Sequence, residues 1–415
     1  MEEVLFMERE IMISNRRWVG RIILLIAFAA GCATIPRASL ENPYGVLEGA
    51  KEGEIFHVPT GIRVTKAQLL NIIGDFRIIY IGETHDNVRA HQVQLGIIMG
   101  LNDRFPGQIA VGMEMFQRPY QGIMDRWSRG ELTERDFLKE SQWYTKWGMD
   151  YDYYKTILDY VRERHIPFLA LNASSDLVKE VRNHRLNDLS EAWQDQLPQM
   201  DLSDPHHRKL VEAFYKAHPP TSAKSFETFY GAYVLWDETM AETIANYLAT
   251  EEGSNKKIVV LAGGNHVRYG FGIPRRTFRR LPVAYSIVLP MEASIPEDKK
   301  ARLMDVSLPK IPLVAADFFW VVSYEDLKRE KVRLGVMLEG ADGNLKVSKV
   351  LKGSLAAKAG IQPGDILVSL DGEDLKESFD LLYLLDQKRP GDATRLLIRR
   401  EDKPLEVTLH FQTPQ

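Results

Sequence analysis

The sequence predicts an α/β protein: a parallel-sheet core with helices on both faces and a helical lobe, followed by a small β-rich domain. Short apolar and β-branched runs alternate with long helical stretches, which is the pattern of parallel strands joined by helices. From about residue 331 the pattern changes to short strands separated by Gly and Asp turns. The chain has 415 residues, 45% of them apolar, and therefore has enough material for two or three packed domains.

The expected strands of the first domain are short and apolar, as buried parallel strands are. They lie at 76–82, 109–115, 167–171, 257–262 and 283–289, and one more is expected at 318–323 after a proline-containing linker. An insertion rich in Trp and Tyr occupies about 117–165, and a longer helical excursion occupies about 174–251. We therefore place an α/β domain over residues 45–325.

Charge and cysteine content exclude several classes of function. Lys and Arg total 53 against 57 Asp and Glu, a net charge of −4 without a block of one sign. This balance argues against a nucleic-acid partner. The single cysteine excludes an intrachain disulfide, a cysteine-based zinc site and a self-contained iron–sulfur site.

That cysteine, Cys32, ends a segment with the features of a secretory signal. Basic residues precede an apolar run at 22–30, which is followed by Gly31 and Cys32. The run is shorter than the roughly 20 residues that span a bilayer. Small residues before Cys32 resemble a bacterial lipobox, and this resemblance implies that 12–32 is a lipoprotein signal peptide and that Cys32 carries the lipid. The expected location is the extracytoplasmic side of the bacterial cell envelope, attached to a membrane. An ordinary signal with an incidental cysteine is the alternative.

The C-terminal region, about 331–412, resembles a PDZ domain. The resemblance rests on Val332-Arg333-Leu334-Gly335-Val336 and on the run from Ser354 through Gly364-Asp365 to Asp371-Gly372. It implies a groove in which the C-terminal or extended peptide of an envelope protein adds a strand to an open sheet edge. The residues that match the carboxylate-binding loop are Leu334, Gly335, Val336 and Met337. An inert β-rich cap is the alternative.

Polar residues follow the apolar runs of four expected strands. They are Glu83 and His85 after the first strand, Glu114 in the second, Asn172 after the third, and Asn265 and His266 after the fourth. Because ligands of an open parallel sheet bind beyond the carboxyl ends of its strands, we expect these side chains to meet at one edge.

Two kinds of chemistry and one structural role are open to such a group. Glu83, His85, Glu114 and His266 are suitable ligands for a divalent metal. Without a metal, a Glu–His pair can act as general base and acid. Alternatively, the Asn and His residues after the strands cap the following helices, and each Glu accepts bonds from helix amides.

Other residues have both a structural and a functional interpretation. Tyr154 lies on the apolar face of an expected helix and is either core or, as a phenolate, an axial ligand to haem iron. His91 is either a ligand contact or a partly exposed helix residue. Asp237 falls in the apolar stripe of a helix at 226–248 and either orients one of the histidines or is a satisfied structural carboxylate. His206 and His207 are expected at solvated helix ends.

Taken together, these blocks resemble the ChaN-type haem-binding lipoprotein family from about residue 60 to 290. They are Ile81–Asn87 followed by His91, Gly112–Phe116, Tyr154–Leu158, Leu169–Asn172, Trp236–Ala241 and Gly263–His266. The resemblance implies an α/β core with a helical lobe, and haem held between two subunits by a tyrosine with histidine assistance. The residues implied for haem binding here are Tyr154, His85, His91, Asn265 and His266, with Tyr154 as the iron ligand.

Two further hypotheses follow from the same sequence. The Gly-Glu-x-His and Gly-Asn-His blocks also resemble a wider superfamily with erythromycin-esterase-like enzymes and Tiki-type metalloproteases. That resemblance implies a hydrolase, metal-dependent or not, with Glu83, His85, Glu114 and His266 as its catalytic residues. The other hypothesis is an envelope scaffold that acts only through its PDZ groove.

Overall fold

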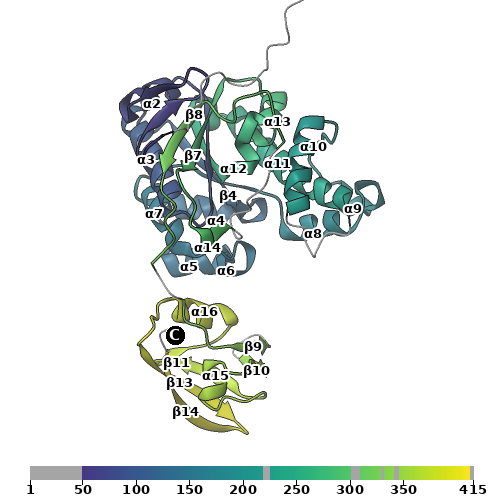
Figure 1. The fold of residues 1–415 in the computed structure, drawn as a ribbon. Helices are drawn as coiled ribbons and strands as arrows, with labels where there is room; N and C mark the ends of the chain where they lie inside the picture. Colours follow the sequence, from purple (N-terminus) through teal and green to yellow (C-terminus); the bar gives the residue numbers. More distant parts are fainter. Residues whose placement is uncertain (1–48, 218–224, 301–308, 329–330, 341–344, 412–415) are drawn as a thin grey trace, which may run out of the picture. The chain divides into compact units, whose positions relative to one another are not determined.

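The computed structural model describes residues 49–217, 225–300, 309–328, 331–340 and 345–411. The predicted signal peptide and Cys32 lie outside this range. The α/β domain and the C-terminal domain are described one at a time below (Figure 1).

The central sheet of the α/β domain contains eight strands in the described part of the chain, in the order β2-β1-β8-β7-β3-β6-β4-β5. Their bounds are β1 Ile55–His57, β2 Ile62–Val64, β3 Ile78–Glu83, β4 Ile109–Gln117, β5 Phe168–Asn172, β6 Lys257–Gly263, β7 Tyr285–Glu292 and β8 Phe318–Val322. The six strands from β8 to β5 pair in parallel, so the predicted parallel core is confirmed.

Two features of the sheet were not predicted. β1 and β2 add an antiparallel pair at one edge, and with three residues each they are too short to produce a pattern in the sequence. The strand expected after the linker is confirmed as β8, and the structure adds its neighbour: β8 pairs in parallel with β7 in the same sheet.

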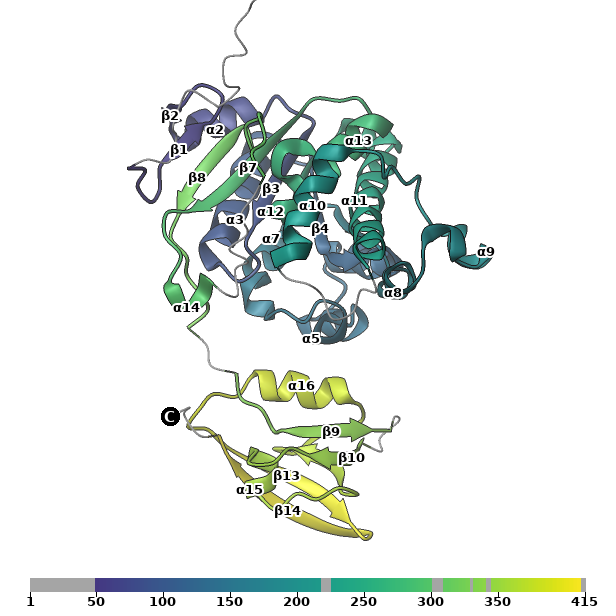
Figure 2. The same cartoon turned by 45° about the vertical axis from the view of Figure 1, so that its right-hand side comes forward.

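Helices cover both faces of the sheet, as predicted (Figures 1 and 2). Alternate residues of a strand point to opposite faces, and in β3 Ile79 and Ile81 join one apolar core while Ile78 and Tyr80 join the other. On the first face lie α2 Lys66–Ile73, α3 Val88–Arg104, α4 Gln121–Ser128, α5 Glu134–Glu140, α6 Trp143–Lys146 and α7 Lys155–Glu163. On the second lie α11 Phe226–Ala249, α12 Gly264–Val267 and α13 Ile273–Arg280.

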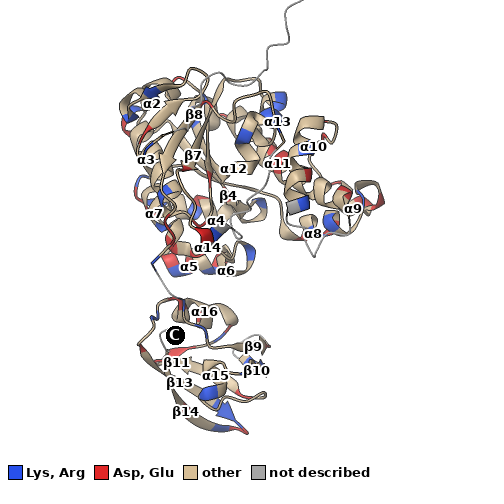
Figure 3. Ribbon diagram, in the orientation of Figure 1, with Lys and Arg blue, Asp and Glu red and all other residues tan. Residues whose placement is uncertain are grey.

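The helical lobe consists of α8 Ser175–Asn183, α9 Glu191–Gln194, α10 Pro205–Ala217 and part of α11 (Figure 2). Basic residues of α13, blue in Figure 3, contact α11 through the buried Glu238. Its carboxylate accepts hydrogen bonds from Arg279 at 2.9 Å and Arg280 at 2.5 Å, which satisfies a charge that burial would otherwise make costly. A short helix, α14 Glu297–Lys300, follows β7. No helix among the described residues is long and apolar enough to cross a membrane.

The C-terminal domain is a small sheet with two helices. Its strand order is β14-β13-β11-β10-β9, with β12 paired to β11, and every pair is antiparallel. The elements are β9 Val336–Glu339, β10 Leu345–Val350, α15 Leu355–Lys358, β11 Ile366–Leu370, β12 Glu373–Asp374, α16 Ser378–Asp386, β13 Ala393–Arg400 and β14 Lys403–His410. β9 pairs only with β10 in the described residues, so its other side is an open edge.

Candidate functional site

Four of the predicted residues meet at the carboxyl ends of β3, β6 and β4, which are neighbours in the sheet. Glu83 is the last residue of β3 and lies in register with Gly263, the last residue of β6. The amide of Gly263 donates to Glu114 Oε2 at 2.7 Å, and His266 Nε2 lies 3.5 Å from Glu114 Oε1. His85 is close as well, because a Cβ added to Gly263 would lie 3.2 Å from His85 Cε1. We call this group the sheet-edge site.

Glu83 is the centre of one half of the sheet-edge site. Its Oε1 lies 2.7 Å from His85 Nδ1 and accepts a hydrogen bond from the Tyr154 hydroxyl at 2.8 Å. Its Oε2 accepts from Gln94 Nε2 at 2.7 Å and lies 3.6 Å from His91 Nδ1. The carboxylate is therefore buried but fully satisfied.

The charges of this half act on one another. Burial by itself would raise the pKa of Glu83, but the potential of His91 and the hydrogen bond and charge of His85 lower it to about 2. Burial would lower the pKa of His85, yet its hydrogen bond to Glu83 and the charge of Glu83 raise it. The pair consequently favours a carboxylate beside a protonated or strongly donating imidazole.

His85 is the accessible member, since 38% of its side chain is exposed while that of Glu83 is fully buried. Its ring meets the Trp147 ring edge-on with centroids 5.0 Å apart. The indole Nε1 of Trp147 is buried. His85 and Trp147 therefore form a pair of contacting aromatic rings at the sheet-edge site.

Tyr154 is a core residue, which is one of the two interpretations that the sequence left open. Its side chain is completely buried in the core that covers one face of the sheet, and its hydroxyl still reaches Glu83 from 71 residues away. Burial and the neighbouring charge of Glu83 raise its pKa well above the ordinary value for a phenol. As an iron ligand, Tyr154 would first have to leave Glu83, and its ligand role stays a prediction.

His91 is placed differently from the expectation of a partly exposed helix residue. It is 3% exposed, with Nδ1 3.0 Å from Gln94 Oε1 and Nε2 3.1 Å from the carbonyl oxygen of His85. Both ring nitrogens are therefore occupied, and His91 supports Glu83 and the turn at His85. It does not face the exposed side of the site.

The other half of the sheet-edge site is centred on His266. Its Nδ1 lies 2.7 Å from Asp237 Oδ1 on α11, so the predicted orienting role of Asp237 agrees with the geometry. The ring of Tyr233 stacks on the His266 ring with centroids 4.7 Å apart. Burial would lower the pKa of His266, but Glu114 and Asp237 raise it to about 9, and the pKa of Asp237 is lowered in turn by His266 and His207 despite its burial.

His207 was expected at a solvated helix end, and this expectation is wrong. The residue is completely buried on α10, and its Nε2 lies 3.0 Å from Asp237 Oδ2. The neighbouring His206 is exposed, as expected. A helical pattern with Leu210, Val211 and Phe214 on the buried side of α10 was the signal that could have identified His207.

The remaining predicted polar residues differ in their contacts. Asn172 donates to the carbonyl oxygen of Glu114 and accepts from the amide of Ala173. Asn87 caps α3, accepting a hydrogen bond from the amide of Arg89. Asn265, beside His266 on α12, is half-buried. Asn87 therefore has the helix-capping role. Glu114 accepts a hydrogen bond from the amide of Gly263, the residue directly before α12.

The predicted metal site is not supported. Within the described part of the chain, no group of three or more His, Cys, Asp or Glu side chains is arranged to hold a metal ion. The reason is that the carboxylates are already committed: Glu83 to His85, Tyr154 and Gln94, and Glu114 to Gly263.

In the C-terminal domain, Leu334–Met337 lead into the open edge of β9. Gly335 has a φ of +80°, and a Cβ at this position would lie 2.3 Å from Ser354 Cβ. The carbonyl oxygens of Leu334 and Gly335 accept hydrogen bonds from the amides of Ala356 and Leu351. The loop is thereby held in one conformation, and Met337 beyond it is 54% exposed.

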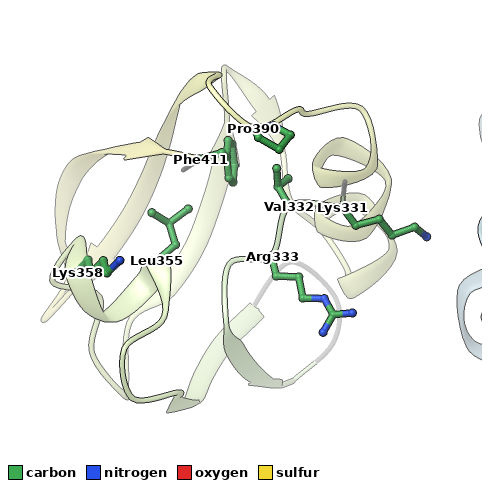
Figure 4. Close-up of a pocket in the computed structure, with 7 residues that line it drawn as sticks. All are labelled: Lys331, Val332, Arg333, Leu355, Lys358, Pro390 and Phe411. Carbon is green, nitrogen blue, oxygen red and sulfur yellow. The ribbon is translucent and has the colours of Figure 1, made fainter. Parts of the chain in front are cut away.

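A cavity of about 170 Å³ lies beside the start of this loop (Figure 4). Its lining consists of Lys331, Val332, Arg333, Leu355, Lys358, Pro390 and Phe411. Because Val336 and Met337 are not among these residues, the cavity is distinct from the open edge of β9.

Comparisons with known families match both domains. A model of the family described as "Haem-binding uptake, Tiki superfamily, ChaN" matches residues 69–277, which is half of the chain, and a PDZ model matches residues 332–411. Among solved structures, one titled "Cofacial heme binding to ChaN of Campylobacter jejuni" aligns with a TM-score of 0.50 and 16% identity. The alignment covers 66% of this chain and 98% of that one, and at this identity it shows the fold alone.

Curated relatives share only a short segment with this chain. The periplasmic pH-dependent serine endoprotease DegQ of Escherichia coli (strain K12) is 42% identical over 67 residues, which is 16% of this chain and 15% of DegQ. The protease RseP of Yersinia pestis is 36% identical over 78 residues, which is 19% of this chain and 17% of RseP. The chain thus spans less than a fifth of the length of these proteases.

Proposed function

Because the chain belongs to the ChaN family of haem-binding proteins in the Tiki superfamily, with a PDZ domain at its C-terminal end, we propose that haem binds at its sheet-edge site. The observation that carries this proposal is the shared contact at Glu83. One carboxylate oxygen holds both the accessible His85 and the buried Tyr154, and imidazole and phenolate are both accepted ligands of haem iron.

The residues at the site fit haem in their chemistry. His85 has its Nδ1 held by a carboxylate, which is the usual arrangement for an imidazole that coordinates through Nε2. Trp147 supplies an aromatic surface beside it. Tyr154 fits as a phenolate ligand only after its hydroxyl leaves Glu83. When bound, haem supplies an iron centre that takes an axial ligand from the protein.

The protein's own groups then have separate tasks. Glu83 fixes the orientation of His85 and is the acceptor from which Tyr154 must be released. Gln94 and His91 hold the second oxygen of Glu83 and keep the carboxylate in place. We propose that His266 and Asn265 contact the same ligand from α12, and that haem is held between two copies of the chain.

A haem titration of the purified chain tests this proposal. The expected result is a Soret band distinct from that of free haem, which saturates at a fixed ratio of haem to protein. Mass measurement with and without haem tests the association of two copies. A haem spectrum that does not change on addition of the protein would refute the proposal.

The finer proposal is that the protein is a lipid-anchored component of the bacterial envelope that handles haem for iron uptake. The order of basic residues, apolar run, Gly31 and Cys32 supports the anchor. The open edge of β9 and the loop at Gly335 support recognition of a peptide with a free carboxylate. We propose that this peptide belongs to another envelope protein.

A second candidate function is a hydrolase without a metal. The specific observation in its favour is the line of Asp237, His266 and Glu114, in which an oriented imidazole lies 3.5 Å from a carboxylate. Turnover of ester or peptide substrates that is lost in a folded His266→Ala variant would support it. If neither haem nor a substrate is bound, and peptide binding alone remains, the protein is a PDZ-based scaffold.

A further inference from the structure

Three titratable side chains from three helices form a buried chain that leads away from the sheet-edge site. His266 on α12 contacts Asp237 on α11, and Asp237 contacts His207 on α10. The side chains of Asp237 and His207 are completely buried, and that of His266 is 10% exposed. The haem proposal above assigns no part to His207.

The surroundings of His207 determine which of its nitrogens carries the proton. Arg276 Nη2 lies 3.3 Å from His207 Nδ1, and a guanidinium can only donate, so Nδ1 is the acceptor. The Tyr230 hydroxyl, 3.3 Å from the same nitrogen, can also donate to it. Burial and Arg276 lower the pKa of His207, in agreement with a neutral ring. The proton is therefore on Nε2, the nitrogen beside Asp237.

Asp237 needs both imidazoles. His266 Nδ1 is at Oδ1, and His207 Nε2 is 3.0 Å from Oδ2. The latter two atoms are not aligned as a hydrogen bond, but neither has any other hydrogen-bond partner in the described residues, so each is the only group that can satisfy the other. A buried carboxylate oxygen without a donor is costly.

The backbone closes the remaining side of Asp237. A Cβ added to Gly272 would lie 3.1 Å from Asp237 Oδ2 and 2.1 Å from the carbonyl oxygen of His266. Water has little room to replace a missing donor there. Without His207 the Asp237 carboxylate would have to turn, and His266 would lose the acceptor that fixes its ring.

We propose that His207 is a positioning residue, which acts through Asp237 to hold the His266 ring with Nε2 directed at Glu114 and the sheet-edge site. The inference concerns the chain without a ligand and does not depend on haem. It predicts a measurable state for each ring. His207 is neutral and protonated at Nε2, and His266 has a protected Nδ1 proton.

NMR of the full chain with ¹⁵N-labelled histidine, recorded without haem, tests the proposal. In the wild type we expect the Nε2–H form of His207 and a downfield, slowly exchanging Nδ1 proton of His266. In His207→Phe that proton should exchange about tenfold faster, because Asp237 Oδ2 loses the donor that faces it and the carboxylate no longer holds the His266 ring in place. In His207→Gln the exchange rate should stay near the wild-type value, because the amide supplies a donor in place of Nε2.

His206→Phe is the matched control, since it makes the same change at the adjacent, exposed position of α10. The Nδ1–H form of His207 in the wild type would overturn the proposal. A folded His207→Phe variant with an unchanged His266 proton would overturn it as well. If His207→Phe does not fold, two other measurements decide the question. They are the protonated nitrogen of His207 in the wild type and the exchange rate of the His266 proton in His207→Gln. Fast exchange in folded His207→Gln contradicts the proposal. Failure to bind haem alters none of these outcomes.

Discussion

The Tyr154 hydroxyl donates a 2.8 Å hydrogen bond to Glu83 Oε1, and both side chains are completely buried. The same oxygen lies 2.7 Å from Nδ1 of the partly exposed His85. A change at Tyr154 is therefore transmitted to the accessible part of the site through one carboxylate. The predictions on haem binding follow from this connection.

Replacement of Tyr154 by Phe should weaken or alter the Soret band, because it removes the predicted phenolate ligand. It should also destabilise the haem-free protein by about 1 to 3 kcal/mol, since a hydrogen bond to a charged acceptor is lost. Denaturant unfolding measures the second effect. Tyr160→Phe is a suitable control, because that phenol contacts Asn102 and lies outside the site. An identical haem spectrum in Tyr154→Phe would remove Tyr154 as a ligand.

Replacement of His85 by Ala should lower haem affinity by about tenfold or more, because it removes the accessible imidazole and leaves Glu83 with one donor fewer. Titration of the Soret band gives the affinity. His184→Ala changes a histidine that is 47% exposed and pairs with Glu180 on α8, and should leave affinity unchanged. Equal affinities in the two variants would contradict the role of His85.

Stability should fall with acid because of Glu83. Its pKa is lowered from 4.5 to about 2 in the folded state, so its contribution is present above pH 4.5 and is lost as the pH falls towards 2. Asp237 acts in the same direction. Urea unfolding of the wild type and of Glu83→Gln between pH 2 and 4.5 measures the effect. The free energy of unfolding should depend less steeply on pH in the variant.

Stability should also fall with alkali because of His266. Its pKa is raised from 6.5 to about 9, so its contribution, on the order of 3 kcal/mol, is present below pH 6.5 and is lost as the pH rises to 9. His266→Gln should lack this part of the slope. His207 and His85 are present in both proteins, so the difference between the two slopes comes from His266 and from the groups whose pKa it shifts, Asp237 and His85. Parallel slopes for the two proteins between pH 6.5 and 9 would be inconsistent with the contacts of His266.

Replacement of Gly335 by Ala should abolish peptide binding, because the φ of Gly335 is +80° and a Cβ at this residue would collide with Ser354. Fluorescence anisotropy with a labelled peptide measures binding, and a peptide amidated at its C-terminus should bind poorly to the wild type as well. Gly372→Ala is the control: its φ is +87°, but a Cβ there meets no atom within 4 Å. Normal binding by Gly335→Ala would exclude this loop as the carboxylate site.

Replacement of Cys32 by Ser should release the protein from the membrane fraction, since the thiol is the predicted lipid attachment point. Cell fractionation with immunodetection shows the distribution. Ser39→Ala, a few residues further along the chain, provides a neutral control. Unchanged partitioning of Cys32→Ser would refute the lipoprotein assignment.

The alternation of apolar runs and helical stretches was sufficient to predict the parallel core, and the position of Glu83, Glu114 and His266 at strand ends was sufficient to predict that they meet. The C-terminal domain was identified through the resemblance of the Gly335 loop and the turns after it to a PDZ domain, and a PDZ model matches it. These features depend on local backbone preferences and on the fixed geometry of a parallel sheet, so they can be inferred from residues near one another in the chain.

Only the tertiary structure decided which side chains pair. The contacts of Tyr154 with Glu83 and of His207 with Asp237 join residues on separate elements, and β1 pairs with β8, more than 250 residues away. Such pairings depend on how helices pack over the sheet and which polar groups are buried together. The packing of the whole core determines these pairings, because buried donors and acceptors need hydrogen-bond partners within the protein.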